Sequence, residues 1–210
     1  MPKARAAELL AMFVAGPTLY AAVDPGPGWL FPALWAWAGA CLWLLLRDPT
    51  FDRRQLWNAR AALGARTAVM ASFVPLGVGI GLAVAVFDAE SLFSLPRRRP
   101  ELWATIMLLY PLVSVYPQEV IFRVFFFHRY GTLFARPGAM IAASALAFGF
   151  VHIVFGNWIA VAMTLIGGTL FAATYARTRS ALAASIEHAL YGCLVFTIGL
   201  GEYFYSGRGG

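Results

Sequence analysis

Long apolar runs separated by short polar segments make up most of this chain. A helix that crosses a hydrocarbon core about 30 Å thick needs roughly 20 apolar residues, because each residue adds about 1.5 Å. Seven runs approach that length: residues 6–23, 29–46, 65–87, 102–127, 138–155, 157–176 and 181–204. The pattern therefore predicts an all-α fold, a polytopic membrane bundle of about seven transmembrane helices.

The segments between these runs predict how the spans are joined. Asp24-Pro-Gly-Pro-Gly28 is typical of a turn. Residues 48–62 carry too many charges to cross a membrane, and their apolar side chains lie among arginines, which predicts an amphipathic helix at the membrane surface. The first run has the basic start of a signal peptide, but no small-x-small cleavage site precedes Asp24, so we expect a retained helix.

Small and weakly polar residues inside the spans predict close packing between helices. The small ones are Gly77 and Gly81 in the third span, Ala145 and Gly149 in the fifth, and Gly167 and Gly168 in the sixth. Cys41 and Cys193 also lie inside apolar runs, and they share no spacing motif. We expect both cysteines to be small buried hydrophobes, so they do not indicate a redox compartment.

Composition excludes a water-soluble domain. Hydrophobic residues make up 60% of the chain and charged residues 12%, and mean hydropathy is +0.70. A soluble domain carries roughly 25% charged residues. The formal net charge is +6, but most arginines lie at the ends of apolar runs, where lipid head groups account for them. We therefore expect membrane lipid as a partner and no nucleic acid.

The distribution of basic residues predicts the orientation of the spans. Cytoplasmic loops of membrane proteins are enriched in Lys and Arg. A cytoplasmic N-terminus places eleven basic residues on the cytoplasmic side: Lys3, Arg5, Arg47, Arg53, Arg54, Arg60, Arg66, Arg129, Arg136, Arg177 and Arg179. The opposite side receives Arg208 and the run Arg97-Arg98-Arg99, which is the exception to the rule. We predict an integral protein of the plasma (inner) membrane with this orientation.

Ionisable residues deep in a span are costly, and they are the candidates for function. They are Glu119 and Arg123 in the fourth span, His152 in the fifth, and Glu187 and His188 in the seventh, with Gln118 and Asn157 as neutral partners. Glu119 and Arg123 are four residues apart and can pair on one helix face, which by itself is compatible with a purely structural ion pair. Two histidines and a carboxylate on three different spans indicate a functional site and not only a structural contact.

Two prolines precede this pair in the same span. Pro111 and Pro117 each remove a backbone donor and kink the helix, which frees carbonyls one turn earlier, that of Val113 among them. Broken helices are tolerated in a membrane where they face protein or a water-filled cavity. Hydrolysis inside a bilayer requires such a cavity, because the reaction consumes water.

Three motifs in successive spans resemble one known family. They are Tyr116-Pro117-Gln118-Glu119-Val120-Ile121-Phe122-Arg123, then Phe148-x-x-x-His152, then His188. This set is similar to the motifs of the CPBP intramembrane endopeptidases (CAAX protease and bacteriocin-processing, or Abi), which include the type II CAAX prenyl endopeptidases. The resemblance covers about residues 102–204. It implies a four-helix catalytic core within residues 102–210, preceded by N-terminal transmembrane helices and the interfacial segment within residues 1–101.

The family pattern is Glu-Glu-x-x-x-Arg, Phe-x-x-x-His and His-x-x-x-Asn/Asp. The resemblance implies that the first glutamate and a histidine activate water, while the other histidine and the Asn/Asp stabilise the oxyanion. This chain departs twice, with Gln118 at the first glutamate and Gly192 at the Asn/Asp. An amide is no general base, so the carboxylate role falls to Glu119. Asn157 is a candidate substitute donor.

The first hypothesis is an intramembrane glutamic-type endopeptidase without a cofactor. In it Glu119, His152 and His188 are catalytic, and the supporting residues are Arg123, Gln118, Asn157 and Glu187. The substrates would be membrane-embedded or lipid-modified protein tails. Three alternatives stay open: zinc held by the same three catalytic residues, although the His-Glu-x-x-His spacing is missing; a catalytically silent relative that binds transmembrane peptides or assists membrane assembly; and a transporter, although no repeat is visible.

Overall fold

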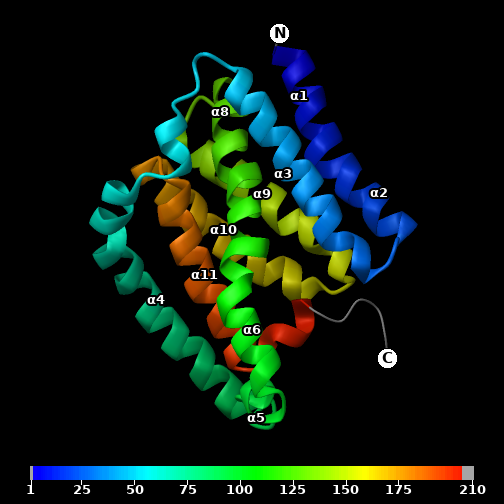
Figure 1. The fold of residues 1–210 in the computed structure, drawn as a ribbon, viewed down its shortest axis with the longest axis vertical. Helices are drawn as coiled ribbons and strands as arrows, with labels where there is room; N and C mark the ends of the chain where they lie inside the picture. Colours follow the sequence, from blue (N-terminus) through cyan, green and yellow to red (C-terminus); the bar gives the residue numbers. More distant parts are fainter. Residues whose placement is uncertain (1, 205–210) are drawn as a thin grey trace.

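Every element of the described chain is helical. The computed structural model describes residues 2–204 and contains no strand in that range (Figure 1). The α-helices are α1 (Pro2–Leu10), α2 (Gly16–Val23), α3 (Leu30–Arg47), α4 (Ala59–Phe87), α5 (Ser94–Arg98), α6 (Pro100–Tyr110), α7 (Tyr116–Glu119), α8 (Phe126–Tyr130), α9 (Pro137–Val151), α10 (Trp158–Thr178) and α11 (Ala181–Thr197). Stretches of π-helix lie at Ala11–Ala15, Pro111–Val115 and Val120–Phe125. Short 3-10 turns lie at Pro27–Trp29, Arg53–Leu56, Gly131–Leu133, His152–Phe155 and Leu200–Phe204.

Six helices in the described chain are long and apolar enough to cross a membrane. They are Lys3–Val23, Pro27–Arg47, Ala59–Phe87, Pro100–Leu133, Pro137–Phe155 and Trp158–Thr178. This confirms the all-α polytopic membrane bundle. The seventh predicted span is shorter than the pattern indicated, because α11 ends at Thr197 after 17 residues. Gly199 then takes a φ of +98°, and a Cβ there would lie 2.0 Å from the carbonyl oxygen of Ser91, so glycine is required at this turn.

The amphipathic helix predicted for residues 48–62 is wrong. This segment holds only the 3-10 turn Arg53–Leu56 before α4 begins at Ala59. Two aspartates explain the difference: Asp48 Oδ1 accepts a hydrogen bond from the backbone N–H of Thr50, and Asp52 Oδ1 accepts one from that of Arg54. Such local bonds offer the backbone an alternative to a helix.

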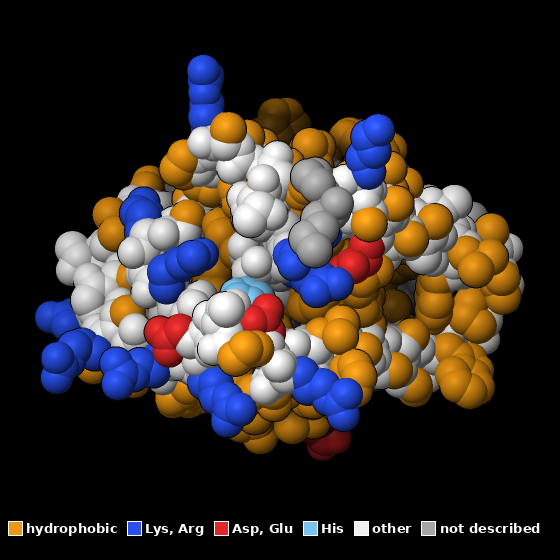
Figure 2. Space-filling model, turned by 90° about the horizontal axis from the view of Figure 1, so that it is seen from above, with side chains coloured by type: hydrophobic (Ala, Val, Ile, Leu, Met, Phe, Trp, Pro, Cys, Tyr) orange, Lys and Arg blue, Asp and Glu red, His pale blue; other side chains and the backbone are white. Residues whose placement is uncertain are grey.

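The basic residues assigned to one side of the membrane gather at one end of the bundle. The N-terminus of α1, α8 and the connection between α3 and α4 lie at that end, and α5, with the exceptional arginine run, lies at the other (Figure 1). Viewed from the first end, many Lys and Arg side chains lie over the left and central part of the face, whereas its right-hand part is hydrophobic (Figure 2). Arg129 forms a two-point ion pair with Glu8 at 2.8 and 2.7 Å, which fastens α1 to α8. Which end faces the cytoplasm stays a prediction.

Close packing of small residues positions α9 against α10. A Cβ at Gly168 would lie 2.9 Å from Cδ1 of Phe148, and one at Gly149 would lie 3.2 Å from Cα of Leu165. These contacts confirm the predicted packing of the fifth and sixth spans. A Cβ at Gly81 would meet no atom of another helix within 4 Å in the part of the chain that the structure describes, so the predicted packing role of Gly81 is wrong.

The N-terminal helix belongs to the core of the bundle. Phe13, in the π-helical stretch between α1 and α2, is 1% exposed. Its ring lies edge-on to Phe126 at 5.0 Å and to Phe122 at 5.5 Å. Cys41 is buried, as predicted, whereas Cys193 is half-buried. The aromatic cluster thus joins the first span to the one that carries Glu119.

Asp48→Asn tests the connection between α3 and α8. The Thr50 hydroxyl (2.6 Å), His128 Nε2 (3.0 Å) and the Thr50 N–H (2.9 Å) surround the Asp48 carboxylate. These hydrogen bonds, from Thr50 first and then His128, hold the pKa of Asp48 below its usual value. The stabilisation is therefore present above about pH 4 and is lost as the pH falls further.

We expect Asp48→Asn to lower the unfolding temperature of the purified protein by a few degrees at pH 7. The difference from the unmodified chain should shrink as the pH falls below about 4. Glu90→Gln, at an exposed carboxylate near the other end, is the control and should leave the unfolding temperature unchanged. A difference that persists undiminished in acid would contradict the carboxylate's role.

Candidate active site

The span that carries Glu119 is irregular helix on both sides of that residue. The π-helical stretches Pro111–Val115 and Val120–Phe125 flank the single turn of α7. The indole Nε1–H of Trp35 donates to the carbonyl of Val113 at 3.0 Å, so one carbonyl freed by proline finds its partner on α3. Stretches of π-helix often occur at functional sites, because they turn side chains out of the regular helical order.

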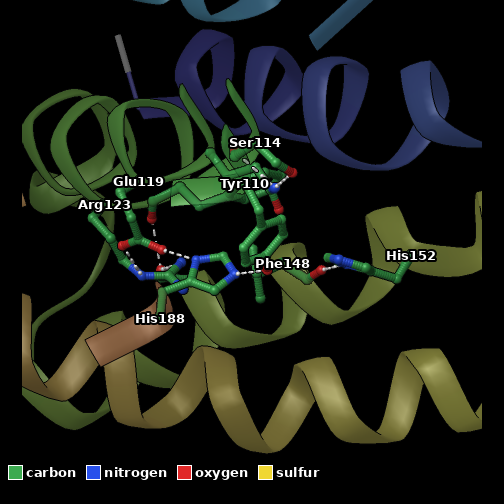
Figure 3. A network of polar contacts seen from close by, with 10 residues as sticks. Tyr110, Ser114, Glu119, Arg123, Phe148, His152 and His188 are labelled. Carbon is green, nitrogen blue, oxygen red and sulfur yellow. Dashed lines mark hydrogen bonds and ion pairs between the residues drawn. The ribbon is translucent and has the colours of Figure 1, made fainter. Parts of the chain in front are cut away.

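Glu119 lies at the centre of a buried polar network (Figure 3). Its Oε1 accepts a hydrogen bond from Nδ1 of His188 on α11 at 2.8 Å, and its Oε2 lies 3.2 Å from Nε of Arg123. Both Glu119 and Arg123 are 0% exposed. The carboxylate therefore joins two helices and meets no solvent.

Arg123 is held by neutral groups on its other side. Its Nη1 donates to Oγ of Ser144 at 3.2 Å, and that hydroxyl donates to the carbonyl of Phe122 at 2.7 Å. The guanidinium carbon lies 4.7 Å from the centre of the Phe148 ring, in cation–π geometry. Among the described residues, its Nη2 has no hydrogen-bond partner. Glu119 thus supplies the negative charge that compensates this buried cation.

The imidazole of His188 is fixed from four sides. It stacks on Phe171 at 4.5 Å with an interplanar angle of 15°, and Phe148 meets it edge-on at 5.3 Å. Its Nδ1 is bonded to Glu119, and its Nε2 lies 3.3 Å from the hydroxyl of Tyr110 on α6. A carboxylate on one ring nitrogen fixes the tautomer and leaves the other nitrogen to face the reacting groups.

His152 occupies the end of α9, where the helix tightens into the turn His152–Phe155. Its Nδ1 lies 2.6 Å from the carbonyl of Phe148. Because a carbonyl only accepts, Nδ1 carries the hydrogen, and Nε2 of the neutral ring is left with a lone pair. Nε2 has no hydrogen-bond partner among residues 2–204, and the side chain is 8% exposed.

Phe148 lies between the two histidines (Figure 3). Its ring centre is 4.8 Å from that of His152 and 5.3 Å from that of His188. The structure thus brings Glu119, Arg123 and His188 into direct contact, with His152 one ring away. Within the described chain, no three His, Cys, Asp or Glu side chains are grouped to hold a metal ion. Whether Glu119, His152 and His188 bind zinc stays a prediction.

Three of the supporting residues point elsewhere. Gln118 donates to both the carbonyl and the hydroxyl of Ser114, each at 2.9 Å, along its own helix. Asn157 caps α10 and donates to the carbonyl of Tyr203 at 2.8 Å. Glu187 faces α4, where the hydroxyl of Ser72 lies 3.4 Å from its Oε1. None of the three contacts Glu119 or a catalytic candidate histidine by a described hydrogen bond.

Tyr110 is a polar residue in contact with His188 that the motifs did not indicate. Its hydroxyl contacts His188 from a position nine residues before Glu119, on the far side of the first π-helical stretch. The sequence offered one sign of this role, which is that Tyr110 is an aromatic residue with a hydroxyl in the span that carries the first motif. That signal is weak, because tyrosines are common in membrane helices for other reasons.

The fold and this site define a polytopic helical membrane protein with a buried carboxylate–histidine centre. Residues 100–194 match the family model described as type II CAAX prenyl endopeptidase Rce1-like. The match confirms the resemblance to the CPBP, or CAAX protease, family, and the matched segment contains every member of the site described above. At the family level it supports a CAAX-type intramembrane protease, which acts on membrane-associated proteins. No curated protein and no solved structure matches the chain.

Arg123→Met tests whether the ion pair holds the site together. It leaves the Glu119 carboxylate buried without its arginine, and breaking a buried pair typically costs about 3–5 kcal/mol. We expect the free energy of unfolding in detergent to fall by about that much. Arg66→Met, at an exposed arginine of α4, is the matched control and should change it by less than about 0.5 kcal/mol. Equal stability of the two variants would show that the pair is dispensable.

Proposed function

We propose that the protein is an intramembrane endopeptidase that hydrolyses peptide bonds in membrane-embedded or lipid-modified protein tails. The observation that carries this proposal is that two histidines with different hydrogen-bond partners lie on either side of the Phe148 ring. His188 is bonded to a buried carboxylate, and His152 keeps an unbonded Nε2. Peptide hydrolysis needs a base on one side of the carbonyl and hydrogen-bond donors on the other.

In this proposal His152 is the general base. Its Nδ1–H is anchored on the Phe148 carbonyl, which sets the tautomer and leaves Nε2 to take a proton from water. Glu119 is less suited to act on water directly, because it is fully buried and each of its oxygens faces a cation or a histidine. Glu119 is then required because it holds the imidazole of His188 in its orientation.

The reaction follows from these roles. Water gives a proton to Nε2 of His152 while its oxygen attacks the carbonyl carbon of the scissile bond. The oxyanion that forms lies toward His188, whose orientation Glu119 fixes. His152 then passes its proton to the departing amine, the carbon–nitrogen bond breaks, and the carbonyl re-forms as an acid. The step uses no metal and no cofactor.

His152→Gln should abolish cleavage while the protein stays folded. Because the side chain makes one hydrogen bond to its own helix and no ion pair, its loss should leave the unfolding temperature nearly unchanged. We expect kcat to fall about 10²–10⁴-fold on membrane-anchored peptide reporters, the usual contribution of a general base. The assay is run with and without a strong chelator, and activity should be the same in both because the proposed step requires no metal.

His128→Gln is the matched control for this experiment. His128, on α8, pairs with Asp48 away from His152. Its loss can therefore alter stability but should leave kcat unchanged. A fully active His152→Gln variant would remove His152 from the mechanism. Activity that disappears with the chelator and returns with zinc would replace the proposal by a metal-dependent one.

A second candidate function is a catalytically silent relative that binds transmembrane peptides. The observation in its favour is Gln118, whose amide is held by Ser114 at the motif's first glutamate position. In that case the site keeps its architecture but lacks the carboxylate that would activate water. Peptide binding would then survive without cleavage.

Gln118→Glu separates the two candidates. A carboxylate cannot donate to the Ser114 carbonyl as the amide does, so the new side chain should leave Ser114. If the natural site is active, we expect cleavage by the unmodified protein and no more than about a tenfold change in kcat for Gln118→Glu, with Gln118→Ala as the control. Cleavage by Gln118→Glu alone would establish that the natural protein is silent.

A further inference from the structure

Gly192 lies one helical turn after His188 on α11, at the position where the family pattern has Asn or Asp. The space beside it is filled by Tyr110. A Cβ at Gly192 would lie 2.4 Å from both the hydroxyl oxygen and Cε1 of Tyr110, closer than any real contact. The phenol ring therefore reaches its place only because residue 192 has no side chain.

Tyr110 is held in that place by aromatic packing. Its ring meets Phe196 edge-on at 5.4 Å and His188 edge-on at 6.2 Å. The hydroxyl then ends 3.3 Å from Nε2 of His188, on the opposite ring nitrogen from Glu119. The space left by Gly192 therefore allows the hydroxyl of Tyr110 to reach His188.

We propose that the Tyr110 hydroxyl is a catalytic oxyanion donor, which takes the place that Gly192 leaves empty beside His188. This inference rests on the proposed endopeptidase function and deepens it. It makes the departure at Gly192 a substitution by a donor from another helix, not a loss of the site.

The hydrogen-bond chain explains how the hydroxyl becomes available. In the resting site Nδ1–H of His188 donates to Glu119, and its Nε2 accepts from the Tyr110 hydroxyl. When the oxyanion forms, the O–H turns about the phenol carbon–oxygen bond from Nε2 to the substrate oxyanion. No proton leaves the tyrosine: the negative charge on the tetrahedral oxygen returns to the carbonyl when the carbon–nitrogen bond breaks.

Tyr110→Phe is the direct test, because it removes one oxygen and keeps the ring that packs over Gly192 and Phe196. We expect kcat to fall about 10²–10³-fold with KM nearly unchanged, the usual loss for one oxyanion donor. Tyr116→Phe is the matched control: its hydroxyl donates to the Leu56 carbonyl at 3.1 Å, away from His188, so kcat should change by less than about twofold. An unchanged kcat for Tyr110→Phe, or a change in KM alone, overturns the inference.

A second set of variants at positions 110 and 192 tests for a hydrogen-bond donor separately from the packing of Tyr110. Gly192→Asn alone should lose activity, because the new side chain collides with Tyr110. In the double variant Tyr110→Ala/Gly192→Asn the amide takes the vacated space as a donor. We expect its kcat to exceed that of Tyr110→Ala at least tenfold. Equal values for the double variant and Tyr110→Ala count against a donor at this place.

Failure of the proposed function can be told apart from failure of this inference. If the unmodified protein cleaves no reporter, binding of peptide phosphinates, whose tetrahedral oxygens mimic the oxyanion, is compared with binding of the parent peptides. A preference for the phosphinates that Tyr110→Phe removes supports the donor in a non-cleaving protein. No preference in the unmodified protein overturns it.

Discussion

The buried contact of Glu119 with Arg123 and His188 is the interaction on which the rest of the site depends. A carboxylate and a guanidinium that are both fully buried are stable only as a pair. The same carboxylate orients the imidazole of His188, so the charge that balances Arg123 also positions the histidine to which we assign a catalytic role. α7 and α11 therefore cannot move apart without exposing both the ion pair and the histidine.

The irregular helix around Glu119 is the structural counterpart of this contact. A regular helix over the whole span would place its residues by a period of 3.6, and few would face the centre of the bundle. The six residues of the second π-helical stretch are all buried instead. The cost of the broken backbone pattern is offset in part by a neighbouring helix, since Trp35 on α3 donates to the Val113 carbonyl.

The two departures from the family pattern have different consequences in the structure. Gln118 turns to Ser114, so it bears on the proposed activation of water. Gly192 makes room for Tyr110, so it bears on the proposed oxyanion donor. The first departure is the reason for considering a silent relative, whereas in our proposal the Tyr110 hydroxyl replaces the side chain that the second departure lacks. The close fit between Tyr110 and Gly192 supports that proposal.

The sequence by itself determined the membrane class, the six long spans among its seven predicted ones, and the motif residues. Apolar run length follows directly from the thickness of the bilayer, and ionisable residues such as Glu119 are rare enough in spans to be found by inspection. It also indicated the Glu119–Arg123 pair, because a spacing of four residues is local. It failed where local hydrogen bonds compete with a helix, because the pattern of apolar residues does not show such bonds. The side chains of Asp48 and Asp52 form turns where a helix was predicted.

Only the tertiary structure decided which candidates meet. His188 contacts Glu119 and His152 does not, although the motifs gave the two histidines equal standing. Tyr110 joined the site because a glycine on a distant helix left space for it, a relation between positions 82 residues apart that no local pattern contains. Side-chain direction in a bundle depends on how helices are rotated and bent against one another, and that is set by packing across the whole core.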